Sequence, residues 1–501
     1  MGYVIGIDLG TSFSAAARVG AAGRPELIPG RHGKLRTPSV VRVGVGPAGA
    51  ARRWPAPASR VVPLVKTALG DPTWRFAVPD GPALRAEEVA ALIVRQLRCD
   101  AQRALGGPVT GAVVTVPACA GDAARQATVN ALRIAGLAVR SVLNEPTAAV
   151  LAHWLPGTAG TALVCDLGGG TFDATVVRTD DRTVEILASE GDRTLGGIDW
   201  DSALMALLNH RFQDAGGPDL LTADDTALEL RSKAEVAKQQ LSVDEQTVML
   251  LGANGLSRVV QVSRSEFECA AADLLARARE LTEHAVAAAG LGWSGLDRLV
   301  LVGGATRMGM VRGMLEQLTG RSAERPASPE ESVVRGAALR ARLVEAVEHG
   351  DLPGDLPGAV PAIVEVASHG LGMLVRDVAT GTRRNVVVLP ANTRLPAERR
   401  DVFATVEDNQ PRVEIEVTQG DDVDPAAVCR LGRRSVLLPP LPAGAPIGVA
   451  YGYDPDQTAY VEVTDLTSDE RLARFEVRAA GAMSDREVAE SIARLADLDV
   501  L

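Results

Sequence analysis

The sequence predicts a duplicated α/β domain, followed by an all-β sandwich and one short C-terminal helix. Strand-like and helix-like segments alternate over residues 1–345, which indicates an α/β architecture. Within that region, IGIDLGTSFS at residues 5–14 and VCDLGGGTFD at residues 164–173 are near copies, which indicates two related halves. Short alternating segments after residue 366 predict the sandwich.

The elements of the first domain follow from local patterns. VTGAVVTVPA at residues 109–118 reads as a buried strand, and GDAARQATVNALRIAG at residues 121–136 reads as the helix after it. The residues after each Asp-Leu-Gly loop also look like strand, so both loops are expected to join two strands of a hairpin. In contrast, LDRLVLVGGATRMGMVRGMLEQL at residues 296–318 predicts a strand, a Gly303-Gly304 turn and then a helix.

Composition sets the remaining boundaries. Repeated Pro and Gly in EHGDLPGDLPGAVP prevent regular structure and predict a linker over residues 346–366. The segments RVEIEVTQG, AYVEVTDL and RFEVRA alternate with turn residues, so residues 367–481 are expected to form the sandwich. Ser484 and Glu487 form a capping-box pattern before an apolar stripe, which predicts a helix within residues 482–501.

The charge balance argues against nucleic acid and anionic membranes as main partners. The chain has 52 Lys and Arg against 63 Asp and Glu, a net charge of −11. No run approaches the roughly 18 apolar residues of a membrane span, and the N-terminal residues lack a signal-peptide pattern. The five cysteines are scattered without CxxC pairs, so reduced thiols and a cytoplasmic location are expected.

The two Asp-Leu-Gly loops predict a triphosphate site. Glycines after a strand let backbone N–H groups approach a phosphate, although a single such loop is often only a tight turn. Two related loops facing one cleft would hold a triphosphate between them. Asp8 and Asp166 stand at equivalent strand ends, where their carboxylates suit Mg²⁺ held through waters, while either alone could be a turn-capping residue. Thr11, Ser12 and Thr171 add hydroxyl groups.

At this point the sequence resembles the DnaK-type chaperones of the heat-shock protein 70 family, which have an actin-like ATPase domain. The motifs IGIDLGTSFS, VVTVPA, LNEPTAAVLA, DLGGGTFD, LGGIDWD and LVGGATRM occur in the family's order. FATVEDNQPRVEIEVTQG at residues 403–420 is similar to a signature of the family's peptide-binding sandwich. The resemblance implies an ATP-hydrolysing chaperone that acts in protein folding and the stress response.

The resemblance also implies roles for individual residues at the phosphates. Lys66 would contact the terminal phosphate, Glu145 would position the attacking water, and Asp173 would be a further polar partner. From the residues alone, Lys66 reads as a surface lysine and Glu145 as the first residue of a helix. The catalytic set is thus Asp8, Lys66, Glu145, Asp166, Thr171 and Asp173, and the phosphate-binding set is Gly10, Thr11, Ser12, Phe13, Gly168, Gly169, Gly170 and Thr171.

For the nucleoside, KAEVAKQQLS at residues 233–242 resembles the family's adenine-binding helix. Its spacing puts Glu235, Lys238, Gln239 and Ser242 on one face, although such a stripe is usually a solvated helix face. The resemblance adds Gly196, Gly197, Gly303, Gly304, Ala305, Thr306 and Arg307 to the nucleotide site. The implied cofactors are ATP or ADP and Mg²⁺, with K⁺ as a further candidate ion.

In the sandwich, the resemblance assigns Phe403, Val406 and Val413 to a cleft for unfolded or extended hydrophobic peptides. Alternation in VEIEV fits plain core packing of Val413 equally well. The resemblance further assigns Pro117 and Arg125 to a switch between the two domains. It implies a J-domain co-chaperone and a nucleotide exchange factor as partners.

The sequence also departs from the family pattern. The chain stops after one helix of the usual lid, the leucine-rich linker appears as AIVEV at residues 362–366, and Ser141 replaces a common basic residue. The segments between Thr37 and Lys66, and between Lys66 and Arg85, look shorter than in the family. Two other functions remain open: a phosphotransferase that uses ATP on a small alcohol, which needs a general base beside a hydroxyl pocket, and a nucleotide-regulated scaffold.

Overall fold

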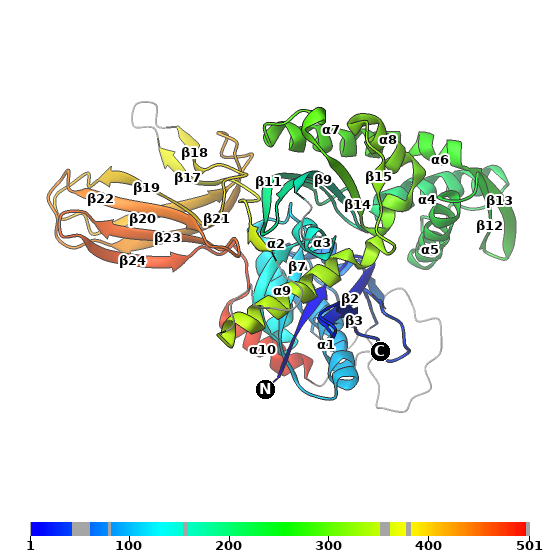
Figure 1. Cartoon of the computed structure of the whole chain (residues 1–501), viewed down its shortest axis with the longest axis horizontal. Coiled ribbons are helices and arrows are strands. Elements are labelled where there is room, and N and C mark those ends of the chain that lie inside the picture. The colour runs from blue at the N-terminus through cyan, green and yellow to red at the C-terminus, as the bar shows by residue number, and fades with distance from the viewer. Residues whose placement is uncertain are drawn as a thin grey trace.

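The computed structural model describes residues 2–42, 61–78, 82–153, 159–350, 361–376 and 382–496. Part of the expected linker, residues 351–360, lies outside this described part, as do residues 43–60 and 79–81 in the segments that look shorter than in the family. Figure 1 shows a two-lobed α/β body with a β-sandwich beside it. This arrangement is the predicted fold class.

The first lobe is built on a six-stranded mixed sheet in the order β3-β2-β1-β7-β8, with β4 paired to β2. Helices α1 (Ala86–Leu105) and α2 (Asp122–Ile134) pack against each other and join its core. The strands are β1 (Tyr3–Asp8), β2 (Phe13–Val19), β3 (Pro25–Leu27), β4 (Thr37–Pro38), β7 (Val109–Val116) and β8 (Ala138–Asn144), and β5 (Val40–Arg42) pairs separately with β6 (Val61–Pro63).

The second lobe repeats this plan with the sheet β15-β14-β9-β10-β11-β16. A hairpin of β12 (Gln246–Ala253) and β13 (Leu256–Ser263) extends from it. Its other strands are β9 (Gly160–Leu167), β10 (Phe172–Thr179), β11 (Thr183–Asp192), β14 (Arg298–Val302) and β15 (Ala323–Glu324); its helices are α4 (Gly197–Asp214), α5 (Asp224–Leu241), α6 (Arg264–Ala270), α7 (Ala272–Ala288) and α8 (Gly309–Thr319).

Both Asp-Leu-Gly loops are hairpin loops, as expected. The strands around the first loop pair antiparallel with Asp8 opposite Ala15, and those around the second pair with Asp166 opposite Asp173. The third glycine site differs from its prediction, because a 3₁₀ turn at Gly304–Arg307 comes first and α8 begins only at Gly309.

Two helices connect the lobes with each other and with the linker. Helix α3 (Glu145–His153) packs against α9 (Ser332–Glu348), and α9 also lies along β1. Helix α9 continues three residues beyond residue 345, into the segment expected to be linker. The linker then forms the short strand β16 (Ala362–Val364), which pairs parallel with β11, so this apolar strand docks on the second lobe.

The sandwich consists of two four-stranded antiparallel sheets that enclose one apolar core. One sheet has the order β18-β17-β20-β21 and the other β19-β22-β23-β24. Their bounds are β17 (Leu371–Arg376), β18 (Arg383–Leu389), β19 (Ala397–Ala404), β20 (Arg412–Gln419), β21 (Cys429–Leu437), β22 (Pro446–Tyr453), β23 (Ala459–Asp465) and β24 (Glu470–Glu476).

The last helix, α10 (Asp485–Leu495), packs against α2 of the first lobe and not on the sandwich. The side chain of Ser484 accepts a hydrogen bond from the Glu487 N–H, as the capping-box pattern predicts. Val488 and Leu495 belong to the apolar core of the first lobe. The buried Glu88 carboxylate accepts hydrogen bonds from the Arg494 guanidinium.

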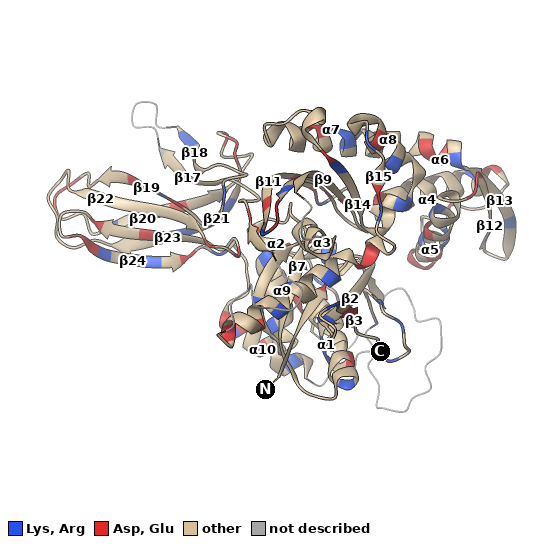
Figure 2. Ribbon diagram, viewed as in Figure 1, with Lys and Arg blue, Asp and Glu red and all other residues tan. Residues whose placement is uncertain are grey.

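Charge is mixed along the described chain. Figure 2 shows basic and acidic residues interspersed on the ribbons of both domains, without a broad basic face in that view of the described residues. None of the described helices is long and apolar enough to cross a membrane.

Candidate active site

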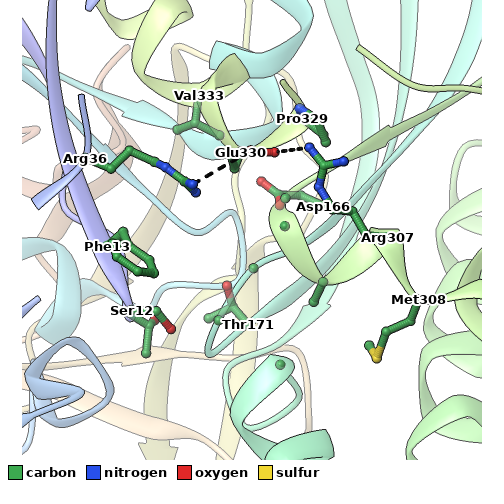
Figure 3. A pocket seen from close by; sticks show the side chains of 18 of the residues that line it. Ser12, Phe13, Arg36, Asp166, Thr171, Arg307, Met308, Pro329, Glu330 and Val333 are labelled. Atoms are coloured by element: carbon green, nitrogen blue, oxygen red, sulfur yellow. Dashed lines mark hydrogen bonds and ion pairs between the residues drawn. The ribbon is translucent and has the colours of Figure 1, made fainter. Parts of the chain in front are cut away.

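A cleft of about 820 Å³ opens between the two lobes and collects most of the predicted nucleotide residues (Figure 3). Both hairpin loops, α5 and the turn after β14 contribute to its wall. The predicted residues that line it are Asp8, Gly10, Thr11, Ser12, Phe13, Lys66, Glu145, Asp166, Gly168, Gly169, Thr171, Gly197, Glu235, Lys238, Gln239, Ser242, Gly303, Gly304, Ala305 and Arg307.

Four predicted residues lie behind this wall. A Cβ on Gly196 would stand 2.3 Å from the backbone of Gly170, so these two glycines permit the close approach of two loops. The Thr306 hydroxyl is buried and donates to the Gly303 carbonyl at 2.7 Å. Asp173 is buried and accepts a hydrogen bond from the Cys119 N–H at 2.9 Å.

Lys66 and Glu145 form a buried ion pair in the cleft, with Nζ and Oε1 2.5 Å apart. Lys66 comes from a 3₁₀ turn at Val65–Ala68, and Glu145 is the first residue of α3, directly after β8. Burial works against a charged Lys66, but the carboxylates of Glu145 and Asp8 outweigh it and raise the lysine pKa. The ammonium therefore stays charged beside the phosphate loops.

The carboxylates around Lys66 are crowded and desolvated. Burial, together with the charge of Glu145, raises the pKa of both Asp8 and Asp173 to about 7. Burial and the same neighbour also raise the pKa of Asp166 well above its usual range. Like charges in a dry site attract a cation, so this donor set fits Mg²⁺. Among the described residues, no group of three or more His, Cys, Asp or Glu side chains is placed to hold a metal ion directly.

Gly303 follows β14 and allows the chain there to lie close to the end of β9. Its φ of +81° favours glycine, and a Cβ there would stand 2.5 Å from an Asp166 carboxylate oxygen. The sequence resemblance assigned this glycine to the nucleotide, and the structure shows that it also makes room for Asp166.

At the other end of the cleft, α5 presents the predicted adenosine residues. Glu235, Lys238 and Gln239 lie within α5, and Ser242 caps its C-terminal end. The Lys238 ammonium is held by the Asp201 carboxylate and the Gly197 carbonyl, each at 2.8 Å. This contact fixes α5 against the start of α4.

The cleft also contains residues that the sequence analysis missed. The Glu330 carboxylate accepts a hydrogen bond from Arg307 at 2.8 Å, and Arg36 faces it from the first lobe. The one local signal was the SPEES segment, where Ser328 and Pro329 precede an acidic helix start. The missed lining residues are Ala15, Arg36, Val243, Met308, Arg325, Pro329, Glu330 and Val333.

The predicted switch residues lie between the cleft and the sandwich. Pro117 lines a small cavity together with Lys66 and Thr171. Arg125 is buried and donates to the side chains of Asn144 and Ser368, the first in the ATPase domain and the second just after the linker. Asn144 directly precedes Glu145 and donates to the linker residue Glu365 at 3.2 Å.

The three predicted peptide residues lie in or between β19 and β20, which belong to different sheets of the sandwich. Phe403 and Val413 are half-buried and pack against the sandwich core, while Val406 is 86% exposed. Ser141, the departure noted in the sequence, donates to Asp456 of the sandwich at 2.7 Å. It therefore belongs to the contact between the two domains.

The fold and the cleft define a class of protein: two related α/β lobes around a cleft, joined to a β-sandwich. Comparison with known proteins narrows this class. The chain matches the family model "Hsp70 protein" over residues 61–497. It is 35% identical over 542 aligned residues to the Chaperone protein DnaK of Trichormus variabilis and to the Chaperone protein dnaK1 of Nostoc sp., with 100% of this chain and 76% of each relative covered.

The chain belongs to the Hsp70 family. The protein is therefore an ATPase and an ATP-dependent chaperone, as the sequence analysis expected. Family membership does not favour the phosphotransferase or the scaffold.

Proposed function

We propose that this chaperone hydrolyses ATP with the cleft residues described above and couples hydrolysis to the capture and release of extended hydrophobic peptides. The observation that supports this proposal best is the meeting of Asp8, Lys66, Glu145 and Asp166 in one cleft. Segments that lie far apart in the sequence supply these four side chains, which together suit a metal-bound triphosphate.

In this mechanism the two hairpin loops hold the phosphates through backbone N–H groups and the hydroxyls of Thr11, Ser12 and Thr171. Glu145 accepts a hydrogen bond from the attacking water and orients it toward the terminal phosphate. Lys66 offsets the negative charge that develops on that phosphate. Mg²⁺, when bound near Asp8 and Asp166, supplies further charge neutralisation, and K⁺ is a second candidate ion.

The nucleoside would lie between α5 and the turn after β14. Glu235 and Lys238 suit the ribose hydroxyls as polar partners, and the planar Arg307 guanidinium suits stacking on a base. ADP and ATP share this half of the site, so their difference would be sensed at Lys66 and the two loops.

The contacts of Arg125 provide a physical route from the cleft to the sandwich. Hydrogen bonds connect Asn144, at the end of the strand before Glu145, to Arg125 and to the linker residue Glu365. A movement of Glu145 would therefore change how the linker packs on the ATPase domain. Phe403, Val406 and Val413 would contact the captured peptide. A J-domain co-chaperone, a nucleotide exchange factor and a cytoplasmic location stay predictions from the sequence and its relatives.

Single-turnover hydrolysis tests this proposal. Wild type should hydrolyse one equivalent of bound ATP, and an extended hydrophobic peptide should speed this hydrolysis. The Lys66→Ala variant should bind ATP but hydrolyse it far more slowly. A peptide that leaves the wild-type rate unchanged would refute the coupling, and a Lys66→Ala rate equal to wild type would refute the assigned site.

A further inference from the structure

A groove of about 740 Å³ lies on one side of the sandwich, between the edge strands of its two sheets. Strand β21 is the last strand of the first sheet and β24 is the last strand of the second, and the two strands contact each other. The volume falls within the roughly 300–1,000 Å³ of ligand sites. The groove shares no lining residue with the nucleotide cleft, and the predicted peptide residues do not line it.

The floor of the groove is apolar. Ile415 and Val417 of β20 and Val477 after β24 are buried members of the sandwich core. Gly432 of β21 is paired with Val417 and has no side chain to cover this floor. A Cβ added at Gly432 would stand 3.4 Å from the Arg478 carbonyl oxygen and 3.9 Å from Val477, so the groove leaves room there for an apolar side chain.

An arginine occupies a core-facing position at the rim of the groove. Arg434 is paired with Ile415, so its side chain leaves β21 on the face that is turned toward the core. On the other sheet, Phe475 is paired with Val461 and is also turned toward the core. The Arg434 guanidinium lies over the Phe475 ring, 5.6 Å from its centroid, and has no ion pair within the described residues. Its N–H groups therefore remain available to an anion.

Positive charge exceeds negative charge around the groove. The charged residues that line it are Arg433, Arg434, Arg474, Arg478, Asp454 and Glu476. The Asp454 carboxylate accepts hydrogen bonds from two N–H groups of its own turn, and Glu476 contacts Arg478 at 3.7 Å. Partly exposed ion pairs are weak, so an incoming carboxylate can replace them. The groove therefore suits a ligand that combines negative charge with apolar groups.

We propose that this groove binds an extended, acidic segment of a partner protein, in which acidic and apolar residues alternate. The edge strand β21 leaves unpaired backbone N–H and C=O groups on its open side, and an extended segment can pair with them. Successive side chains of such a segment point to opposite faces. The apolar ones would cover Ile415 and Val417, and the long arginine side chains of the rim would reach the carboxylates between them.

Fluorescence anisotropy with the full chain tests this proposal. The probe is a labelled peptide that alternates Glu and Val over about nine residues, the length of β21. Wild type should bind it more tightly than the matching peptide with Gln in place of Glu, and added salt should weaken the binding. Amide exchange in β21 should slow when the peptide is bound.

Two arginines of the same strand provide the matched comparison. Arg434→Gln should weaken binding of the Glu peptide about five- to ten-fold, the effect of one charge-assisted hydrogen bond at a partly exposed site. Arg430→Gln is the control, because Arg430 also lies on β21 and contacts the Glu416 carboxylate at 3.5 Å but does not line the groove. Its affinity should stay within about two-fold of wild type.

A second variant fills the groove instead of removing charge. Gly432→Val adds methyl groups over the floor, and a β-branched residue suits a strand, so unfolding by urea should show no loss of stability. Its binding of the Glu peptide should fall about ten-fold or more. Equal binding of the Glu and Gln peptides, equal effects of Arg434→Gln and Arg430→Gln, or wild-type binding by a folded Gly432→Val overturns the proposal. Loss of binding in Val406→Asp would place the peptide in the predicted peptide cleft and overturn it as well.

Discussion

The Lys66 ammonium and the Glu145 carboxylate meet at 2.5 Å in the cleft, each largely shielded from water. Lys66 belongs to a 3₁₀ turn after β6, and Glu145 is the first residue of α3. Each side chain therefore restricts the position of the other in the cleft. This preorganised pair leads to the first prediction.

Removal of either partner should slow chemistry more than binding. Lys66→Ala and Glu145→Gln should each lower the single-turnover rate about 100-fold or more, because each contributes charge or orientation near the transferred phosphate. ATP affinity, measured by calorimetry, should change much less. Loss of affinity equal to the loss of rate would show that the pair binds ATP without acting in hydrolysis.

Glycines that look alike in the sequence should respond in opposite ways to alanine. Gly303→Ala requires a strained φ and a clash with Leu167 and Asp166, so unfolding by urea should show a loss of about 2–3 kcal/mol. Gly313→Ala, inside α8 with nothing within 4 Å of the added methyl, should gain up to about 1 kcal/mol. Equal effects would mean that the loop around Gly303 relaxes freely.

Docking of the sandwich on the ATPase domain should depend on pH through Asp122. Burial raises the pKa of this carboxyl to about 6, although the Ala479 N–H donates to it. The docked form therefore binds a proton more tightly than an undocked one, and docking should strengthen as pH falls from about 6 toward 4, by at most about 3 kcal/mol.

Other groups at this contact also titrate. Burial raises the pKa of Glu365, which adds to the trend, and lowers the pKa of His369, which opposes it. The measurement therefore compares two proteins: fluorescence energy transfer between the two domains is recorded as a function of pH in wild type and in Asp122→Asn. The wild type should gain more transfer on acidification, and parallel curves would exclude Asp122 as the source.

Helix α10 should detach more often from the first lobe when the buried Glu88 carboxylate loses its ion pair with Arg494. Arg494→Ala leaves the Glu88 carboxylate buried without its guanidinium, which should cost about 2 kcal/mol of docking free energy. Amide exchange in α10 should then be roughly 30-fold faster. Arg486→Ala, on the same helix but with an 85% exposed side chain, should leave exchange within about two-fold of wild type. Similar exchange in both variants would show that apolar packing alone holds the helix.

The sequence predicted the parts of the site that repeat or follow a local pattern. Asp8 and Asp166 were visible because two similar loops end two strands, and hairpin pairing follows from the strand-like residues after each loop. Lys66 and Glu145 came only from resemblance, since a single lysine or glutamate has no pattern of its own. The ends of α8 and α9 were less predictable, because a 3₁₀ turn and a helix extension depend on their neighbours.

Contacts between distant segments were not predictable from the sequence. Arg36 and Glu330 lie in unrelated polar stretches, and only the folded chain brings their side chains within 3.9 Å of each other. The assignment of Gly170 and Gly196 to the nucleotide stays a prediction, and the close approach of their two loops could not be read from the sequence. The amphipathic pattern of α10 predicted a helix correctly, yet it did not show that the ATPase domain receives its apolar face.

That position of α10 has a consequence for synthesis. The core of the first lobe includes Ile5 and Ile7 from β1, and also Met483, Val488 and Leu495 from the far end of the chain. The ribosome must therefore synthesise the whole sandwich before α10 is available to pack on the surface of α2. The lobe translated first is completed last, and a nascent chain must keep that apolar surface from aggregating until then.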